Sequence, residues 1–115
     1  MKILLAVSAT VALTAGSVFA HHGWGSYDAA EPVTVTATID DIVIENPHGM
    51  MKLTVDGKLW HVTLAPIRRM NVRGATAEIV QKGKTVTAHG YPKRDGTPEF
   101  RAEWIEIDGT RYQLR

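Results

Sequence analysis

The chain contains no cysteine. No disulfide bond can therefore support the fold, no cysteine behind an export signal can carry a lipid anchor, and no thiol nucleophile is available for catalysis. Serine offers no replacement, because Ser26 lacks the glycine-flanked elbow that presents a catalytic serine. The neighbouring carboxylates of Asp40 and Asp41 point to opposite faces of a strand, which does not suit paired acid–base chemistry. We therefore expect a protein that is not an enzyme.

The chain also has no large excess of positive or negative charge. The 13 Lys and Arg residues face 12 Asp and Glu residues, and the balance becomes 12 to 12 once Lys2 is assigned to an export signal. Proteins that bind nucleic acids normally carry a basic patch. The sequence therefore predicts no nucleic-acid partner.

Only one long apolar run is present, from Ile3 to Leu13, and it follows Lys2. Val18 and Ala20 stand at the two positions that a signal peptidase inspects. A bilayer span needs roughly 20 apolar residues, so this run is too short, and no second run follows it. We expect residues 1–20 to be a signal peptide, and the mature chain to be a periplasmic protein without a membrane span.

Histidine is abundant, with five residues that all follow the predicted cleavage site. Cleavage after Ala20 would make His21 the first residue of the mature chain and His22 the second. The new amine and two imidazoles would then lie within a few ångströms of one another, and nitrogen donors of this kind suit copper. The sequence therefore predicts a copper site at His21 and His22.

From residue 33 onward the chain has the period of two that is typical of β-strands. Apolar residues stand at odd numbers from Val33 to Ile39, and at even numbers at Ile42 and Ile44. One extra residue near Asp40 explains the change of phase as a β-bulge, which bends a strand so that a sheet can close. A small barrel requires such a curved first strand.

The motif Asp56-Gly57 predicts a two-residue hairpin between strands two and three, because both positions favour positive φ. In the resulting register Leu53 faces Trp60 on the core side of the sheet. Lys52 faces His61 on the opposite side. The alternation of a half-buried antiparallel sheet accounts for this division.

Further along the chain, Pro66 ends the third strand, and apolar residues between positions 67 and 80 predict one or two short helical turns. Three more strands are predicted over residues 85–91, 100–107 and 110–114. This order predicts an all-β protein, a small OB-fold-like barrel of five or six antiparallel strands with a short helical connection between strands three and four. Residues 33–115 form this barrel domain, and residues 21–32 form a flexible arm before it.

A second group of metal donors stands near the first hairpin. His48 belongs to the Asn46-Pro47-His48 turn, and Met50 lies diagonally opposite His61 on the face that carries Lys52. Thioether sulfur with imidazole suits Cu(I), whereas calcium or magnesium would require clustered carboxylates. We therefore expect His48 to assist the amino-terminal pair, with His61 and Met50 as additional candidate ligands. Simpler interpretations stay open, with His61 as a solvated strand residue and His48 as a turn residue.

Aromatic residues suggest a different function. Trp24 and Tyr27 lie in the arm, and Trp60 lies in the third strand. Barrels of the predicted type commonly bind ligands on the surface of strands two and three. The alternative hypothesis is an envelope module without metal, in which these three residues dock a protein or a small ligand.

Several short motifs occur in a fixed order along the mature chain. They are the His21-His22 pair, the Asn46-Pro47-His48 turn, the Trp60-His61 strand pair and the hairpin at Arg94-Asp95-Gly96. In these motifs the chain resembles an uncharacterised family of small exported bacterial proteins, defined only as a domain of unknown function. The resemblance covers the whole mature chain. It implies a periplasmic location and a barrel-like β domain, and it supplies no established activity.

A weaker resemblance concerns residue types. Periplasmic copper chaperones of efflux systems are OB-type barrels that bind Cu(I) through a histidine, two methionines and a nearby tryptophan. This chain has His61, Met50, Met51 and Trp60 in the corresponding region, although Met50 and Met51 are adjacent and would point to opposite faces. The resemblance implies Cu(I) chemistry and a partner in an envelope metal-handling system.

Overall fold

The computed structural model describes residues 23–115. The predicted signal peptide and the His21-His22 pair lie outside these residues. The described elements, in chain order, are η2 (Trp24–Ser26), β1 (Val33–Val43), β2 (Met50–Val55), β3 (Lys58–Thr63), α1 (Ile67–Val72), β4 (Thr85–Pro92), β5 (Glu99–Ile107) and β6 (Thr110–Gln113). Within residues 23–115 no helix is long and apolar enough to cross a membrane.

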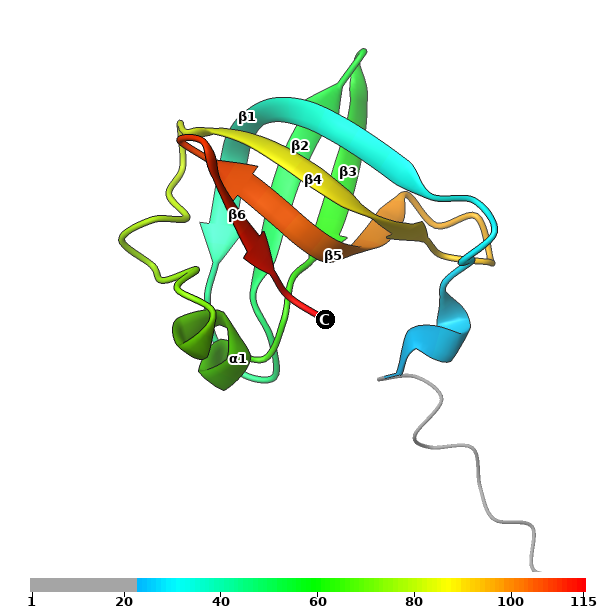
Figure 1. Cartoon of the computed structure of the whole chain (residues 1–115). Helices are drawn as coiled ribbons and strands as arrows, with labels where there is room; N and C mark the ends of the chain where they lie inside the picture. The colour runs from blue at the N-terminus through cyan, green and yellow to red at the C-terminus, as the bar shows by residue number, and fades with distance from the viewer. Residues whose placement is uncertain (1–22) are drawn as a thin grey trace, which may run out of the picture.

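Five strands close into a barrel, and β6 extends the sheet beyond β5 (Figure 1). The strand order is β3-β2-β1-β4-β5-β6, and a pairing between β3 and β5 completes the ring. This closing pair is parallel, with His61 opposite Glu99 and Thr63 opposite Arg101. The prediction of a small OB-like β-barrel is confirmed in this form, and the prediction that all its strands are antiparallel is wrong. A closed ring with an odd number of strands cannot alternate direction all the way round, so one pair must be parallel.

The bulge predicted in β1 is present. The register of β1 against β2 shifts between Ile39 and Asp41. β1 pairs with β4 over residues 33–38, and it pairs with β2 from Ile39 onward. The extra residue therefore bends β1 near the point where its pairing partner changes from β4 to β2.

The first hairpin has the predicted register. Asp56 and Gly57 both have positive φ, at 51° and 77°, as a tight primed turn requires. Leu53 pairs with Trp60, and Lys52 pairs with His61. This register sends one set of side chains into the barrel and leaves the other on its outer surface.

The barrel interior holds one continuous apolar core. Its largest fully buried side chains include Ile39, Met51, Leu53, Val62, Phe100 and Ile105. Helix α1 lies at one end of the barrel, where Met70 is fully buried (Figure 1). The predicted helical connection is therefore present as a single short helix between β3 and β4.

The segment before β1 contacts the barrel. Tyr27 pairs with Lys93 in an isolated antiparallel bridge and is 7% exposed. The Asp28 amide donates to the Pro92 carbonyl, and the Arg94 amide donates to the Ser26 carbonyl. Part of the predicted arm, residues 24–28, thus lies against the loop between β4 and β5, and strand periodicity gives no sign of this contact.

Candidate functional site

Two rows of side chains cross the outer surface of β1, β2, β3 and β5. Each row follows paired residues through four neighbouring strands. The first row is Asp41, Lys52, His61 and Glu99, and the second is Val43, Met50, Thr63 and Arg101. The row between them is Ile42, Met51, Val62 and Phe100, which faces the core. Because side chains alternate along a strand, both flanking rows face outward.

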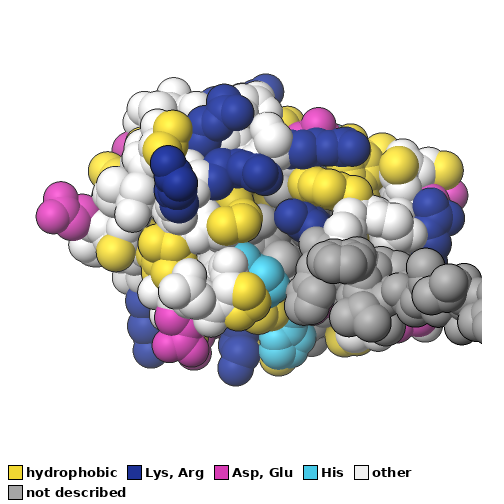
Figure 2. Space-filling view, turned by 90° about the horizontal axis from the view of Figure 1, so that it is seen from below, with side chains coloured by type: hydrophobic (Ala, Val, Ile, Leu, Met, Phe, Trp, Pro, Cys, Tyr) yellow, Lys and Arg dark blue, Asp and Glu magenta, His cyan; other side chains and the backbone are white. Residues whose placement is uncertain are grey.

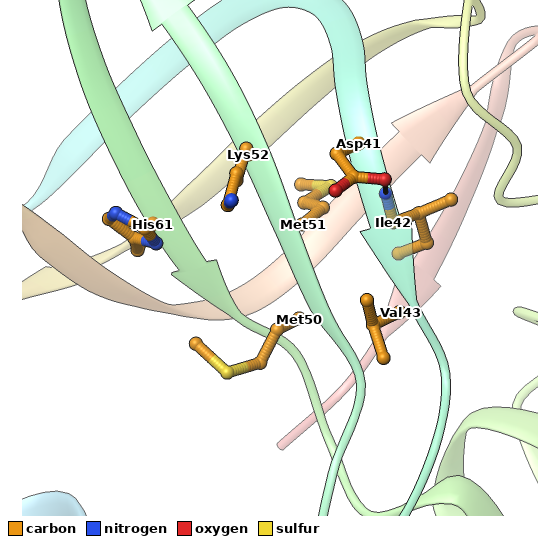
Figure 3. Close-up of a pocket in the computed structure, with 7 residues that line it drawn as sticks. All are labelled: Asp41, Ile42, Val43, Met50, Met51, Lys52 and His61. Atoms are coloured by element: carbon orange, nitrogen blue, oxygen red, sulfur yellow. Dashed lines mark hydrogen bonds between the residues drawn. The ribbon is translucent and has the colours of Figure 1, made fainter.

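A pocket of about 220 Å³ lies on this outer face, over β1, β2 and β3. It is lined by Asp41, Ile42, Val43, Met50, Met51, Lys52 and His61. In Figure 3 the Met50 side chain extends from β2 toward β3, on which His61 lies. A thioether and an imidazole thus border the same pocket, as the hairpin register predicts. Met51 is 1% exposed and belongs to the core.

His48 lies in the loop between β1 and β2 and is not among the residues that line this pocket. Its side chain is partly buried, and its Nδ1 atom is buried without a hydrogen-bond partner among residues 23–115. The neighbouring Gly49 amide donates to Ala65, and the Gly49 carbonyl accepts from Leu64. The structure therefore joins the His48 turn to the end of β3, apart from the Met50–His61 pocket.

The amino-terminal segment covers the β5 end of the two rows. The Tyr27 hydroxyl donates to Glu99 over 2.9 Å. Burial raises the pKa of the Tyr27 hydroxyl to about 12, with Thr63 lowering it and Glu99 raising it further. The Trp24 ring centroid lies 4.4 Å from the guanidinium carbon of Arg101 and 4.5 Å from that of Arg115, at distances typical of cation–π contacts.

Trp24, Tyr27 and Trp60 do not form one exposed surface. Trp60 is half-buried, packs against the core and meets Phe100 edge to face at 5.6 Å. Tyr27 is almost fully buried, and its hydroxyl donates to Glu99. The interaction surface predicted from these three residues is therefore divided by the sheet, because Trp60 pairs with Leu53 on the inner side.

The other described histidine, His89, has structural contacts. Its ring stacks on Trp104 with centroids 5.3 Å apart, and its Nδ1 lies 2.7 Å from the Thr34 hydroxyl. These contacts hold the His89 ring, on β4, between the neighbouring strands β1 and β5. Among residues 23–115 no group of three His, Asp or Glu side chains is placed to hold a metal ion.

The sequence model of DUF6152, a family of unknown function, matches residues 8–100. The chain belongs to this family. The predicted membership in an uncharacterised domain family is thus confirmed. No curated protein matches the sequence.

Solved structures similar to this DUF6152 member share its barrel. A chain in the Stn1–Ten1 complex of S. pombe has a TM-score of 0.54 and 17% identity, over 66% of this chain and 57% of that chain. TiaS in complex with a tRNA and ATP has a TM-score of 0.52 and 16% identity, over 70% of this chain and 19% of that chain. A ZRD-deleted TiaS mutant with agmatine has a TM-score of 0.55 and 15% identity, over 76% of this chain and 27% of that chain.

These identities establish the fold alone, and the chain spans only 19% to 57% of the lengths of the chains it matches. The expectation that this DUF6152 member binds no nucleic acid therefore stays a prediction. OB-folds use the outer face of strands two and three, with the flanking loops, for ligands. The Met50–His61 pocket lies on that face, over β1, β2 and β3.

Proposed function

We propose that this protein is a non-enzymatic copper-binding protein of the bacterial periplasm. Its ligands are the amine and imidazoles of His21 and His22, together with Met50 and His61. The observation that carries the proposal is that Met50 and His61 border one pocket, on a face whose other half is covered by the segment that follows His22.

A site shared between the amino terminus and β2–β3 sets a requirement on the course of the chain before Trp24. Trp24 contacts Arg101 on β5, which is two strands away from Met50 in the same row. Adjacent strands are about 4.8 Å apart, so this separation is roughly 10 Å. His22 precedes Trp24 by two residues, which span up to about 7 Å when extended. The proposal therefore requires the backbone before Trp24 to run across β5 and β3 toward Met50, because Trp24 contacts Arg101 through the ends of both side chains.

The donor set supports copper over harder cations. A thioether and an imidazole suit Cu(I), and an amine with imidazoles suits Cu(II). Met50 and His61 are preferred to His48 here because they share a pocket, whereas His48 lies apart from it. His48 remains an additional candidate, since its Nδ1 lacks a hydrogen-bond partner among the described residues.

Metal titration of the correctly cleaved chain tests the proposal, with Ag(I) as the stand-in for Cu(I). Loss of even a second-shell partner commonly weakens metal binding ten- to hundredfold, so loss of a direct ligand should weaken it at least tenfold. We expect M50L and H61N each to have this effect on Ag(I). The matched controls are M51L, which alters a core methionine, and H89N, which alters a histidine held by Thr34 and Trp104.

Cu(II) binding tests the amino-terminal ligands separately. We expect the H21A/H22A variant, or a chain that retains an extra residue before His21, to lose most of its Cu(II) affinity, because the amine chelate is removed. The proposal would be refuted if both variants, H21A/H22A and M50L/H61N, bound Cu(II) and Ag(I) with the affinity of the wild type.

Exposed apolar side chains favour one alternative, an envelope interaction module without metal. Val43 at the pocket is 45% exposed, and Leu59 on β3 is 44% exposed. A photo-crosslinking residue at Val43 should then capture one partner in chelator-treated cells, while the same residue at exposed Thr36 on β1 should not. Capture that requires copper would instead support the metal-binding function.

A further inference from the structure

Helix α1 presents an unusual concentration of arginine. Arg68 and Arg69 lie in the helix and Arg73 follows its last residue, and all three are exposed. The helix, with sequence IRRMNV, contains no acidic residue. None of the ion pairs between described residues involves these three arginines.

Two further arginines lie near α1. Arg101 and Arg115 both contact the Trp24 ring, and Arg69 donates to the carbonyl of Leu114, the residue before Arg115. Burial lowers the pKa of Arg101, Tyr27 raises it, and the positive charges of Arg69 and Arg115 lower it. Glu103 lies 4.0 Å from Arg115, but it also accepts a hydrogen bond from Tyr91. One end of the barrel therefore carries five of the seven arginines in residues 23–115.

The charges of the chain are separated in space. The described residues contain 12 basic and 12 acidic side chains, so they have no net charge. Figure 2 shows the barrel from the end at which α1 lies, and Lys and Arg side chains gather over this face. Basic side chains gathered on one face attract an anionic surface at short range, even when the chain as a whole has no net charge.

An exposed apolar side chain stands among these arginines. Val72 is 76% exposed, and with Pro66, Arg68, Arg69 and Arg73 it lines a shallow hollow. Guanidinium groups bind phosphate through paired hydrogen bonds. Arginines around a protruding apolar residue are typical of surfaces that lie at a membrane interface, where the apolar group enters the headgroup region. The exposed Val72 favours a lipid surface over an acidic protein.

We propose that the α1 end, formed by Arg68, Arg69 and Arg73 around Val72, docks on the anionic phospholipids of a membrane surface. This inference does not depend on copper binding. The α1 hollow shares no lining residue with the Met50–His61 pocket.

Vesicle co-sedimentation of the mature chain tests the proposal. The probes are vesicles of phosphatidylglycerol with phosphatidylcholine, and vesicles of phosphatidylcholine alone. We expect binding only to the anionic vesicles, and weaker binding at high salt. Each basic residue removed near the surface should weaken partitioning roughly fivefold, so R68Q/R73Q should lose about 25-fold. Arg69 is left in place because it donates to the Leu114 carbonyl.

Matched variants separate docking from general charge and from folding. K52Q/K58Q removes the same charge from the β2–β3 hairpin and should bind within about twofold of wild type by the same reasoning. V72S should weaken vesicle binding several-fold, whereas L59S should not, and circular dichroism checks that each variant is folded. Equal losses in R68Q/R73Q and K52Q/K58Q, or equal binding to both vesicle types, would overturn the proposal. Binding to polyglutamate without binding to vesicles would overturn it in favour of an acidic protein partner.

Discussion

Alkaline pH should destabilise this protein through Tyr27. The hydroxyl of Tyr27 is buried and donates to Glu99, and burial raises its pKa from about 10 to about 12. In the unfolded chain tyrosine ionises near its ordinary pKa of about 10. Between these two values the folded protein keeps a proton that the unfolded chain has lost.

The sign and size of the effect follow from proton linkage. The stabilisation from the raised pKa is fully present below about pH 10, and it is lost as pH rises through about pH 12. Each pKa unit corresponds to about 1.36 kcal/mol, so a shift of about two units amounts to roughly 2.7 kcal/mol. This is a large part of the unfolding free energy of a small domain.

Urea unfolding followed by tryptophan fluorescence provides the assay, with Y27F as the reference that cannot ionise at this position. We expect the difference in unfolding free energy between wild type and Y27F to fall by about 2–3 kcal/mol between roughly pH 9 and pH 12. Ionisation of every other group occurs in both proteins and cancels in the difference. Parallel stability curves over this range would refute the burial of Tyr27 against Glu99.

Two further predictions concern packing. A Cβ atom at Gly90 would lie 1.9 Å from the Arg101 carbonyl oxygen, a backbone atom that cannot swing away, so G90A should cost at least about 3 kcal/mol in unfolding free energy. G25A is the control, because nothing lies within 4 Å of its added Cβ, and a change as small as that of G25A would contradict the close approach of β4 and β5. M51A should cost about 2–5 kcal/mol because Met51 is buried, whereas M50A on the outer face should cost under about 1 kcal/mol. Equal costs in thermal unfolding would show that the hairpin register is misassigned.

Local features of the fold could be predicted because they depend on neighbouring residues. The Asp56-Gly57 turn forces the register of β2 and β3, and the change of phase near Asp40 marks the bulge in β1. The same register brings Met50 and His61 to one face, since the tight turn relates their positions directly. That part of the candidate site could therefore be predicted without any long-range contact.

Other parts of the candidate site could not be predicted in this way. The arm of residues 21–32 has no strand periodicity, and the burial of Tyr27 depends on Glu99, which lies 72 positions away. Trp60 was also considered for an interaction surface. The predicted hairpin register already placed it on the core side, but its partner there, Phe100 on β5, could not be predicted. Such contacts join segments that are linked neither by a tight turn nor by a repeating pattern in the sequence.

By itself, the sequence determined the alternating strands, the first hairpin and the bulge, because backbone periodicity and turn chemistry act over a few residues. Only the tertiary structure decided how the ring closes, since β3 and β5 meet through a parallel pair that no hairpin signals. It also decided that Trp24 and Tyr27 cover part of the outer face, and that Arg69, Arg101 and Arg115 gather at one end. These arrangements arise from packing between segments that are distant in the sequence. No periodic pattern in the sequence indicates which distant segments will meet.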